Sequence, residues 1–173
     1  MEKEIVNRVA SSTLVSIDLE GFYTQGERVL IDIKDLLFEG IILKEKDFRD
    51  FIKNHDWSQY TGKLVAITCT VDAVIPTWAY MLLTIALQPF AGKIFFGSLA
   101  DLESYLFQDV LAGVNWEQYR GAKVVIKGCS KLEVPTSAYV AVSRYLQPLV
   151  ASMMYGEPCS TVPLYKKVKK SEE

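Results

Sequence analysis

The 173-residue sequence is 50% hydrophobic and 23% charged, with a formal net charge of −2 at pH 7. This length suits one compact domain, and the lack of a basic surplus argues against nucleic acid as a partner. Residues 1–8 lack the apolar segment of a signal peptide, so we expect a cytoplasmic protein. Disulfides are rare in that compartment, so the three cysteines are expected to be thiols or metal ligands.

The first 56 residues are predicted to form an α+β extension that packs on the rest of the chain. Residues 13–19 alternate apolar and polar side chains, as a half-exposed strand does. Residues 28–33 form a second candidate strand, which we expect to make a hairpin with the first through Gly26. A charged helix with one apolar face follows at residues 45–54.

Residues 57–97 and 116–156 resemble one another along their whole length. The residues they share include Trp57 and Trp116, Tyr60 and Tyr119, Gly62 and Gly121, Pro76 and Pro135, Tyr80 and Tyr139, and Gly97 and Gly156. In this alignment the second copy has one inserted residue before its strand at residues 123–127 and one deleted residue in the loop after that strand. The two gaps align Cys69 with Cys129. The duplication predicts two repeats in a single compact domain, at residues 57–115 and 116–165, followed by a charged tail at 166–173.

Each repeat has the pattern of strand, loop, helix and strand. The predicted strands are residues 64–68, 93–96, 123–127 and 152–155, and the predicted helices are about 76–90 and 135–150. Proline suits the first turn of each helix, because it has no N–H to lose there. Another helix starts at Ser98 with a capping-box pattern and ends near Gly113. This alternation predicts an α/β fold with a mainly parallel sheet built from two tandem βαβ-like repeats.

The segment Ala73–Gly92 carries no charged residue and is long enough to span a bilayer. Pro76 and Pro89 interrupt it, and the corresponding helix of the second repeat contains Arg144. The segment is therefore predicted to form a helix of the core, and no membrane association is expected.

The cysteines are the main candidate functional residues. If all predicted strands share one sheet, Cys69, Cys129 and Cys159 all follow strands at its carboxyl edge, where open α/β sheets bind ligands. Three thiolates and a fourth ligand are a suitable set for zinc or an iron–sulfur cluster. Asp72, His55 or an exogenous group is the candidate fourth ligand.

Two other functions remain open at this point. The positive end of a helix lowers the pKa of a nearby thiol, so one cysteine is a candidate nucleophile of a small-molecule enzyme. Free cysteines are also often buried packing residues, as in a structural or partner-binding module. Thr77 and Thr136, at the predicted helix starts, are candidate ligand-binding residues or ordinary first-turn residues.

Several segments give the chain its resemblance to a known family. They are Glu4–Arg8, Leu43–Phe48, His55–Trp57, Pro76–Tyr80, Lys127–Ser130 and Tyr155–Tyr165. In these segments the chain resembles a family of bacterial proteins catalogued as domain of unknown function 2480. The resemblance brings no established activity, but its genomic setting implies iron–sulfur assembly proteins as partners.

These patterns together predict a cytoplasmic accessory protein that binds a metal or an iron–sulfur species. We expect it to deliver, store or scaffold that species rather than to turn over a substrate. The apolar residues Met153, Met154 and Tyr155 also suggest a homodimer interface.

Overall fold

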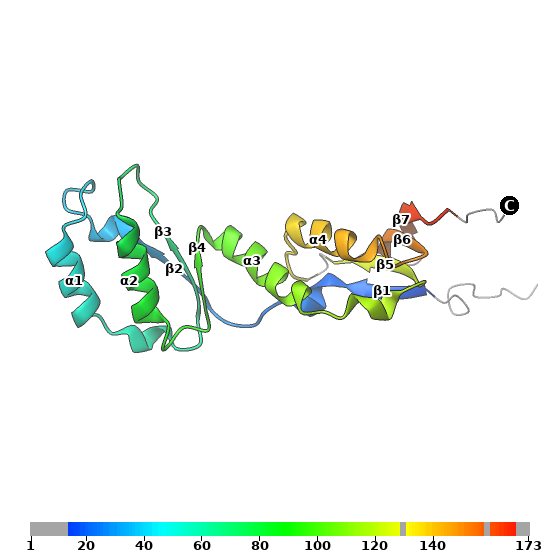
Figure 1. Cartoon of the computed structure of the whole chain (residues 1–173), viewed down its shortest axis with the longest axis horizontal. Coiled ribbons are helices and arrows are strands. Elements are labelled where there is room, and N and C mark those ends of the chain that lie inside the picture. Colours follow the sequence, from blue (N-terminus) through cyan, green and yellow to red (C-terminus); the bar gives the residue numbers. More distant parts are fainter. Residues whose placement is uncertain (1–13, 129–130, 158–159, 169–173) are drawn as a thin grey trace, which may run out of the picture. The chain divides into compact units, whose positions relative to one another are not determined.

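The chain forms two compact units, each with its own sheet and helices (Figure 1). The computed structural model describes residues 14–128, 131–157 and 160–168. Unit 1 comprises residues 1–24 and 106–173, and unit 2 comprises residues 25–105. In the sequence, unit 2 therefore interrupts unit 1 after its first strand. The predicted α/β class with mainly parallel strands is confirmed.

Unit 2 contains a three-stranded parallel sheet in the order β2-β3-β4. Its elements, with η for a 3-10 helix, are β2 (Arg28–Asp32), η2 (Ile33–Leu36), α1 (Glu45–Asn54), η3 (Trp57–Tyr60), β3 (Leu64–Thr68), α2 (Thr77–Leu87) and β4 (Lys93–Phe96). Alternate residues of β3, Val65 and Ile67, belong to the same buried cluster as Ala79, Leu83 and Leu87 of α2. The four-residue spacing on α2 and the two-residue spacing on β3 place these side chains on facing surfaces.

Unit 1 contains a four-stranded sheet in the order β1-β5-β6-β7. Its elements are β1 (Leu14–Asp18), η1 (Leu19–Phe22), the second half of α3 (Leu99–Ala112), η4 (Trp116–Tyr119), β5 (Lys123–Lys127), α4 (Thr136–Leu146), β6 (Ser152–Glu157) and β7 (Ser160–Lys166). The first three strands are parallel, and β7 pairs antiparallel with β6. Val124 and Ile126 of β5 share a buried cluster with Ala138, Val142 and Leu146 of α4.

The two units share one architecture apart from β7, and from α1 to β4 each residue of unit 2 corresponds to the residue of unit 1 that lies 59 positions later. The indole of Trp57 donates a 2.8 Å hydrogen bond to the carbonyl of Ile52, and the indole of Trp116 donates a 2.9 Å bond to Leu111. Because Ile52 lies in α1 and Leu111 in α3, the second half of α3 is the counterpart of α1.

The similarity also includes the first strand of each unit, which the predicted repeats did not contain. Asp18 ends β1 and accepts a hydrogen bond from the N–H of Glu20, at 3.1 Å. Asp32 ends β2 and accepts one from the N–H of Lys34, at 3.0 Å. Each aspartate thereby caps the 3-10 helix that follows its strand. Residues 14–56 therefore form no separate extension, because they supply the first strand of both units.

The predicted hairpin between the first two strands and the predicted single sheet are both wrong. β1 pairs with β5 in unit 1, whereas β2 pairs with β3 in unit 2. Each central strand already has a parallel neighbour on both sides, so the described strands of the two copies form separate sheets. The premise that one carboxyl edge collects all three cysteines is thereby removed.

The two gaps in the predicted alignment are also wrong. Lys123 is the first residue of β5 and pairs with the first residue of β1, just as Leu64 is the first residue of β3 and pairs with the first of β2. Lys123 therefore corresponds to Leu64, not to Lys63. The same offset carries Cys69 onto Gly128, so Cys69 is not the counterpart of Cys129.

The predicted helices are present: α1 and α3 have the predicted extent, whereas α2 and α4 are shorter than expected. α2 and α4 both end just before a Gln-Pro pair. The predicted capping box is confirmed: the Ser98 hydroxyl accepts from the N–H of Asp101, and the Asp101 carboxylate accepts from the N–H of Ser98. Strand β7 was not predicted. It contains Pro163, which an edge strand tolerates because half of its backbone groups need no partner strand.

Candidate functional site

Two of the four predicted metal ligands, Cys129 and Cys159, lie outside the described residues. Cys69 is half-buried after β3, and its thiol donates a long, 3.6 Å hydrogen bond to the carbonyl of Val71. Among the residues that the structure describes, no three His, Cys, Asp or Glu side chains lie close enough to hold a metal ion. Metal binding by the three cysteines and Asp72 stays a prediction.

The surroundings of Cys69 differ from those of its counterpart in unit 1. Burial raises the pKa of the neighbouring Tyr80, and the nearby Cys69 and Asp32 raise it further. At Gly128 an added Cβ would lie 2.8 Å from the hydroxyl of Tyr139, the counterpart of Tyr80. Unit 2 thus has a thiol beside this tyrosine, whereas unit 1 has the tyrosine hydroxyl against bare backbone.

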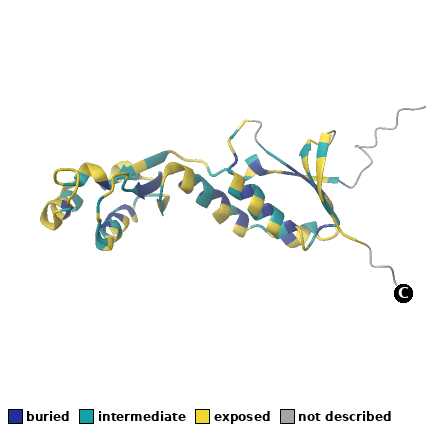
Figure 2. Cartoon of the chain, turned by 90° about the horizontal axis from the view of Figure 1, so that it is seen from above, coloured by how far each residue is buried: buried dark blue, intermediate teal, exposed yellow. Residues whose placement is uncertain are grey.

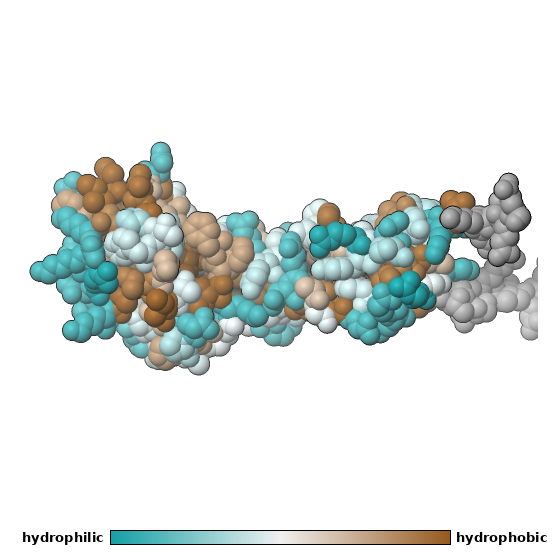
Figure 3. Space-filling view, in the orientation of Figure 1, coloured by the Kyte–Doolittle hydropathy of each residue, from teal (hydrophilic) through white to brown (hydrophobic). Residues whose placement is uncertain are grey.

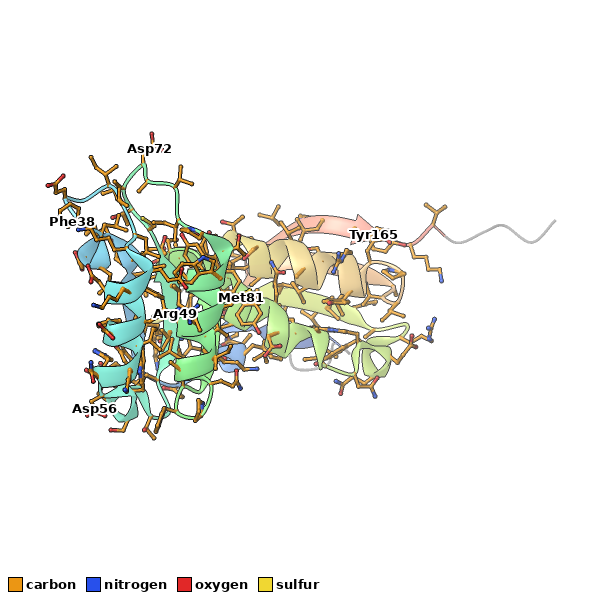
Figure 4. All side chains as sticks on the ribbon, turned by 60° about the vertical axis from the view of Figure 1, so that its left-hand side comes forward. Phe38, Arg49, Asp56, Asp72, Met81 and Tyr165 are labelled. Carbon is orange, nitrogen blue, oxygen red and sulfur yellow. The ribbon has the colours of Figure 1, made fainter. Side chains whose placement is uncertain are left out.

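Asp72 and His55 lie at opposite ends of unit 2. Asp72 is exposed in the loop after β3, at the end of the unit far from Asp56, the neighbour of His55 (Figure 4). The N–H of His55 donates to the carbonyl of Phe51, so this histidine ends α1. Its predicted position at the end of a helix is confirmed, and His55 and Asp72 lie too far apart to share one metal site.

Thr77 and Thr136 are the first residues of α2 and α4, and both are exposed. Pro76 and Pro135 precede them and make no side-chain capping bond. Their predicted place in the first turn of a helix is confirmed. Thr136 also lines a hollow in unit 1, described below.

Asp32 anchors the loop after β3 by accepting hydrogen bonds from Thr70, and no sequence pattern pointed to this residue. Its carboxylate accepts a 3.1 Å bond from the N–H of Thr70 and a 2.5 Å bond from the hydroxyl of Thr70, and Lys34 lies 3.3 Å away. Its side chain is only 9% exposed. Burial raises the pKa of Asp32, but the bonds from Thr70 and Lys34 outweigh burial and bring it below the ordinary value.

We expect Asp32→Asn to lower the free energy of unfolding at pH 7 by about 1–2 kcal/mol, because charge-assisted hydrogen bonds are lost. Since the folded pKa of Asp32 is depressed, its contribution is present above the unfolded pKa of about 3.9 and is lost as pH falls below it. The wild-type and the variant should therefore converge in stability as the pH falls through the folded pKa of Asp32, which lies below the ordinary value. Urea unfolding at several pH values measures this.

The matched control is Asp18→Asn, at the corresponding position of unit 1. Asp18 is 45% exposed and has a 3.5 Å ion pair with Lys127 in place of the loop bonds. We expect a change of less than about 0.5 kcal/mol. An equal loss in both variants would show that the loop bonds of Asp32 add nothing.

An exposed apolar surface lies on unit 2, around α2 and β4 (Figure 3). Met81 and Ile85, one turn apart on α2, are 60% and 66% exposed. Phe96, at the end of β4, is 65% exposed and packs edge-to-face on Tyr80, with ring centroids 5.1 Å apart. We call Met81, Ile85 and Phe96 the α2 face. Figure 2 shows the burial pattern, with exposed positions on the outer side of the helices.

Unit 1 has two adjoining hollows between α4 and strands β6 and β7, which together we call the α4 groove. The first has a volume of about 380 Å³ and is lined by Ile126, Thr136, Tyr139, Ser143, Tyr155 and Leu164. The second has a volume of about 540 Å³ and is lined by Ser143, Arg144, Gln147, Met153, Leu164 and Tyr165. Because the hollows share Ser143 and Leu164, they form one groove along α4. The first hollow lies near the carboxyl ends of β5 and β6, and the second lies toward the amino end of β6, beside the last turn of α4.

A sequence family described as "Protein of unknown function (DUF2480)" matches residues 3–167. The chain belongs to this family. No curated protein and no solved structure matches the chain.

The long uncharged segment of this DUF2480 protein forms α2, of 11 residues. Of the helices that the structure describes, none combines the length and hydrophobicity of a transmembrane span. Ala79, Leu83 and Leu87 are fully buried, which confirms the predicted core helix. The prediction missed that the opposite side of α2 is exposed, and the signal was present: the helix is apolar all round and so has no polar side for solvent.

Proposed function

We propose that this DUF2480 protein is a binding module rather than an enzyme, and that unit 2 pairs through its α2 face with a second copy of the chain. The observation that carries the proposal is the exposure of Met81, Ile85 and Phe96, each at least 60% exposed. Exposed apolar side chains that cluster on one surface commonly mark a protein interface.

The duplication supports a functional reason for this surface. Ile85 corresponds to Arg144 in unit 1, and Phe96 corresponds to Tyr155. A helix in the same place in the same fold therefore accepts a charged residue there. Because the fold does not demand an apolar residue at position 85, burial against a partner is the better explanation for Ile85.

The chemistry of the α2 face favours a second copy as the partner. α2 carries no charged residue. In a two-fold symmetric contact, the same patch on both chains meets itself. A charged patch would place like charges together, whereas an uncharged apolar patch buries no unpaired charge in such a contact. The charged helix α1 lies beside α2, where Arg49 stacks on Trp78 at 5.5 Å, and would form a polar rim (Figure 4).

Sedimentation analysis over a concentration series tests the proposal. We expect the wild-type chain to form dimers, and Ile85→Arg to weaken dimerisation at least about tenfold, because it places two guanidinium groups in the contact. The variant should keep its circular dichroism spectrum, since unit 1 folds with arginine at the corresponding position.

The control is Val140→Arg, which changes an equally exposed apolar residue of α4 and is expected to leave dimerisation unchanged. Val140 corresponds to Met81 and is 64% exposed. A wild-type chain that stays monomeric at every concentration contradicts the proposal. So does a dimer that Val140→Arg disrupts and Ile85→Arg does not.

Zinc or iron–sulfur binding remains the competing proposal. It keeps Cys69, Cys129, Cys159 and Asp72 as its ligands, and iron–sulfur assembly proteins as its partners. This proposal assumed that the cysteines follow strands of one sheet, but β3 lies in a different sheet from β5 and β6. A reactive-thiol enzyme is supported still less, because Cys69 has no base at hydrogen-bond distance among the described residues.

A further inference from the structure

We infer that the α4 groove of unit 1 binds a small anion with a flat apolar body, such as an aromatic carboxylate or phosphate. The first hollow lies at the carboxyl end of the parallel strands β5 and β6, beside the first turn of α4, where ligands of open α/β sheets bind. The second hollow continues along α4 to its last turn, near the amino end of β6. The two hollows, of about 380 and 540 Å³, have the size of small-molecule sites. This inference concerns unit 1 and does not depend on dimerisation through unit 2.

Three features that distinguish unit 1 from unit 2 come together in this groove. The strand β7 has no counterpart among the described elements of unit 2, and its Leu164 lines both hollows. Arg144 stands where unit 2 has Ile85, and Tyr155 stands where unit 2 has Phe96. Unit 2 folds without any of the three, so the fold itself does not require them.

The lining suits an aromatic body. Tyr139 and Tyr155 pack edge-to-face, with centroids 5.8 Å apart and planes at 81°, and Ile126 and Leu164 complete an apolar wall. A flat ring can add to such a pair in offset or edge-to-face contact. The hydroxyls of Thr136 and Ser143 offer hydrogen bonds to polar substituents of the ligand.

The charge of the groove suits an anion. Arg144 lines the second hollow, and its guanidinium lies over the ring of Tyr145, 5.3 Å from the centroid. Among the described residues no carboxylate forms an ion pair with it. The lining residues of both hollows include no acidic side chain. A guanidinium group binds carboxylate or phosphate with two parallel hydrogen bonds. Gln147, in the same hollow, can donate a further bond.

Methyl-detected NMR of the full chain tests the inference with three probes: benzoate, phenyl phosphate and the neutral analogue benzamide. We expect benzoate or phenyl phosphate to shift the methyl signals of Ile126 and Leu164, and to bind at least about tenfold more tightly than benzamide. The tighter of the two anions identifies the ligand as carboxylate or phosphate.

The variant Arg144→Ile installs the residue that unit 2 has at this position, so the fold should persist. It should remove the advantage of the anions over benzamide and leave benzamide binding unchanged. The control Arg120→Ala removes a guanidinium that pairs with Glu117 and lines neither hollow, and it should change nothing. The inference is overturned if no probe shifts these methyls at about 10 mM, if benzamide binds as well as the anions, or if Arg144→Ile binds them normally.

Discussion

Replacing Gly156 with alanine is expected to destabilise unit 1 by about 3 kcal/mol. Gly156 lies in β6 at a φ of +116°, which side-chain-bearing residues rarely adopt, and such strain costs about 1–3 kcal/mol. An added Cβ would also lie 2.7 Å from the backbone oxygen of Ser160 in β7. The Cβ is fixed by the backbone of β6 and the Ser160 oxygen belongs to the backbone of β7, so the clash is relieved only if β6 and β7 move apart. Urea unfolding followed by circular dichroism measures the loss.

Gly121→Ala is the matched control. Gly121 also has a positive φ, of +74°, but an added Cβ there would have no atom within 4 Å. Only the left-handed backbone conformation is penalised, so we expect a loss of about 1 kcal/mol. Equal losses at the two glycines would mean that the contact between β6 and β7 is loose. That result would also weaken the inference that the α4 groove binds a ligand, since β7 forms one of its walls.

Replacing Leu146 with alanine is expected to lower the free energy of unfolding by about 3 kcal/mol, within the usual 2–5 for a buried leucine. Leu146 is fully buried on the side of α4 that faces the sheet, in the cluster with Val124 and Val142. The substitution removes the transfer free energy of three carbons and leaves a cavity, because close-packed neighbours relax only in part.

Val140→Ala on the same helix is the control for Leu146→Ala. Val140 is 64% exposed, so we expect a change within about 0.5 kcal/mol. Both variants remove apolar atoms from the same helix, three carbons at Leu146 and two at Val140, and the main difference between the two positions is burial. Because alanine has the highest helix propensity, propensity alone predicts no loss in either variant. A similar loss in both would show that burial in the core does not set the contribution of Leu146.

The repeated elements were predictable because their signals are local. Pro76 and Pro135 mark helix starts, and the capping box at Ser98 and Asp101 marks another, because each depends on backbone groups within a few residues. The short β-branched runs that became β3 and β5 were recognised in the same way.

The candidate site was less predictable, because it depended on an alignment and on strand pairing. Cys69 and Cys129 are both cysteines, and their positions within the two repeats differ by a single residue. A one-residue gap therefore aligns them and raises the apparent similarity of the repeats. The strand register instead makes Gly128 the counterpart of Cys69. At Gly128 the hydroxyl of Tyr139 leaves no room for a side chain. The groove involves β7, and its edge-strand sequence with Pro163 carries a weak strand signal.

The sequence by itself determined the α/β class, the duplicated strand–helix–strand units and the helix starts, since these follow from periodicity and capping within short windows. Only the tertiary structure decided that β1 pairs with β5 and β2 with β3, which divides the described strands between two sheets. The reason is physical: backbone hydrogen bonds between strands are the same for every sequence. The choice of partner strand therefore depends on which long-range arrangement buries both apolar helices and both sheets, and no local pattern records it.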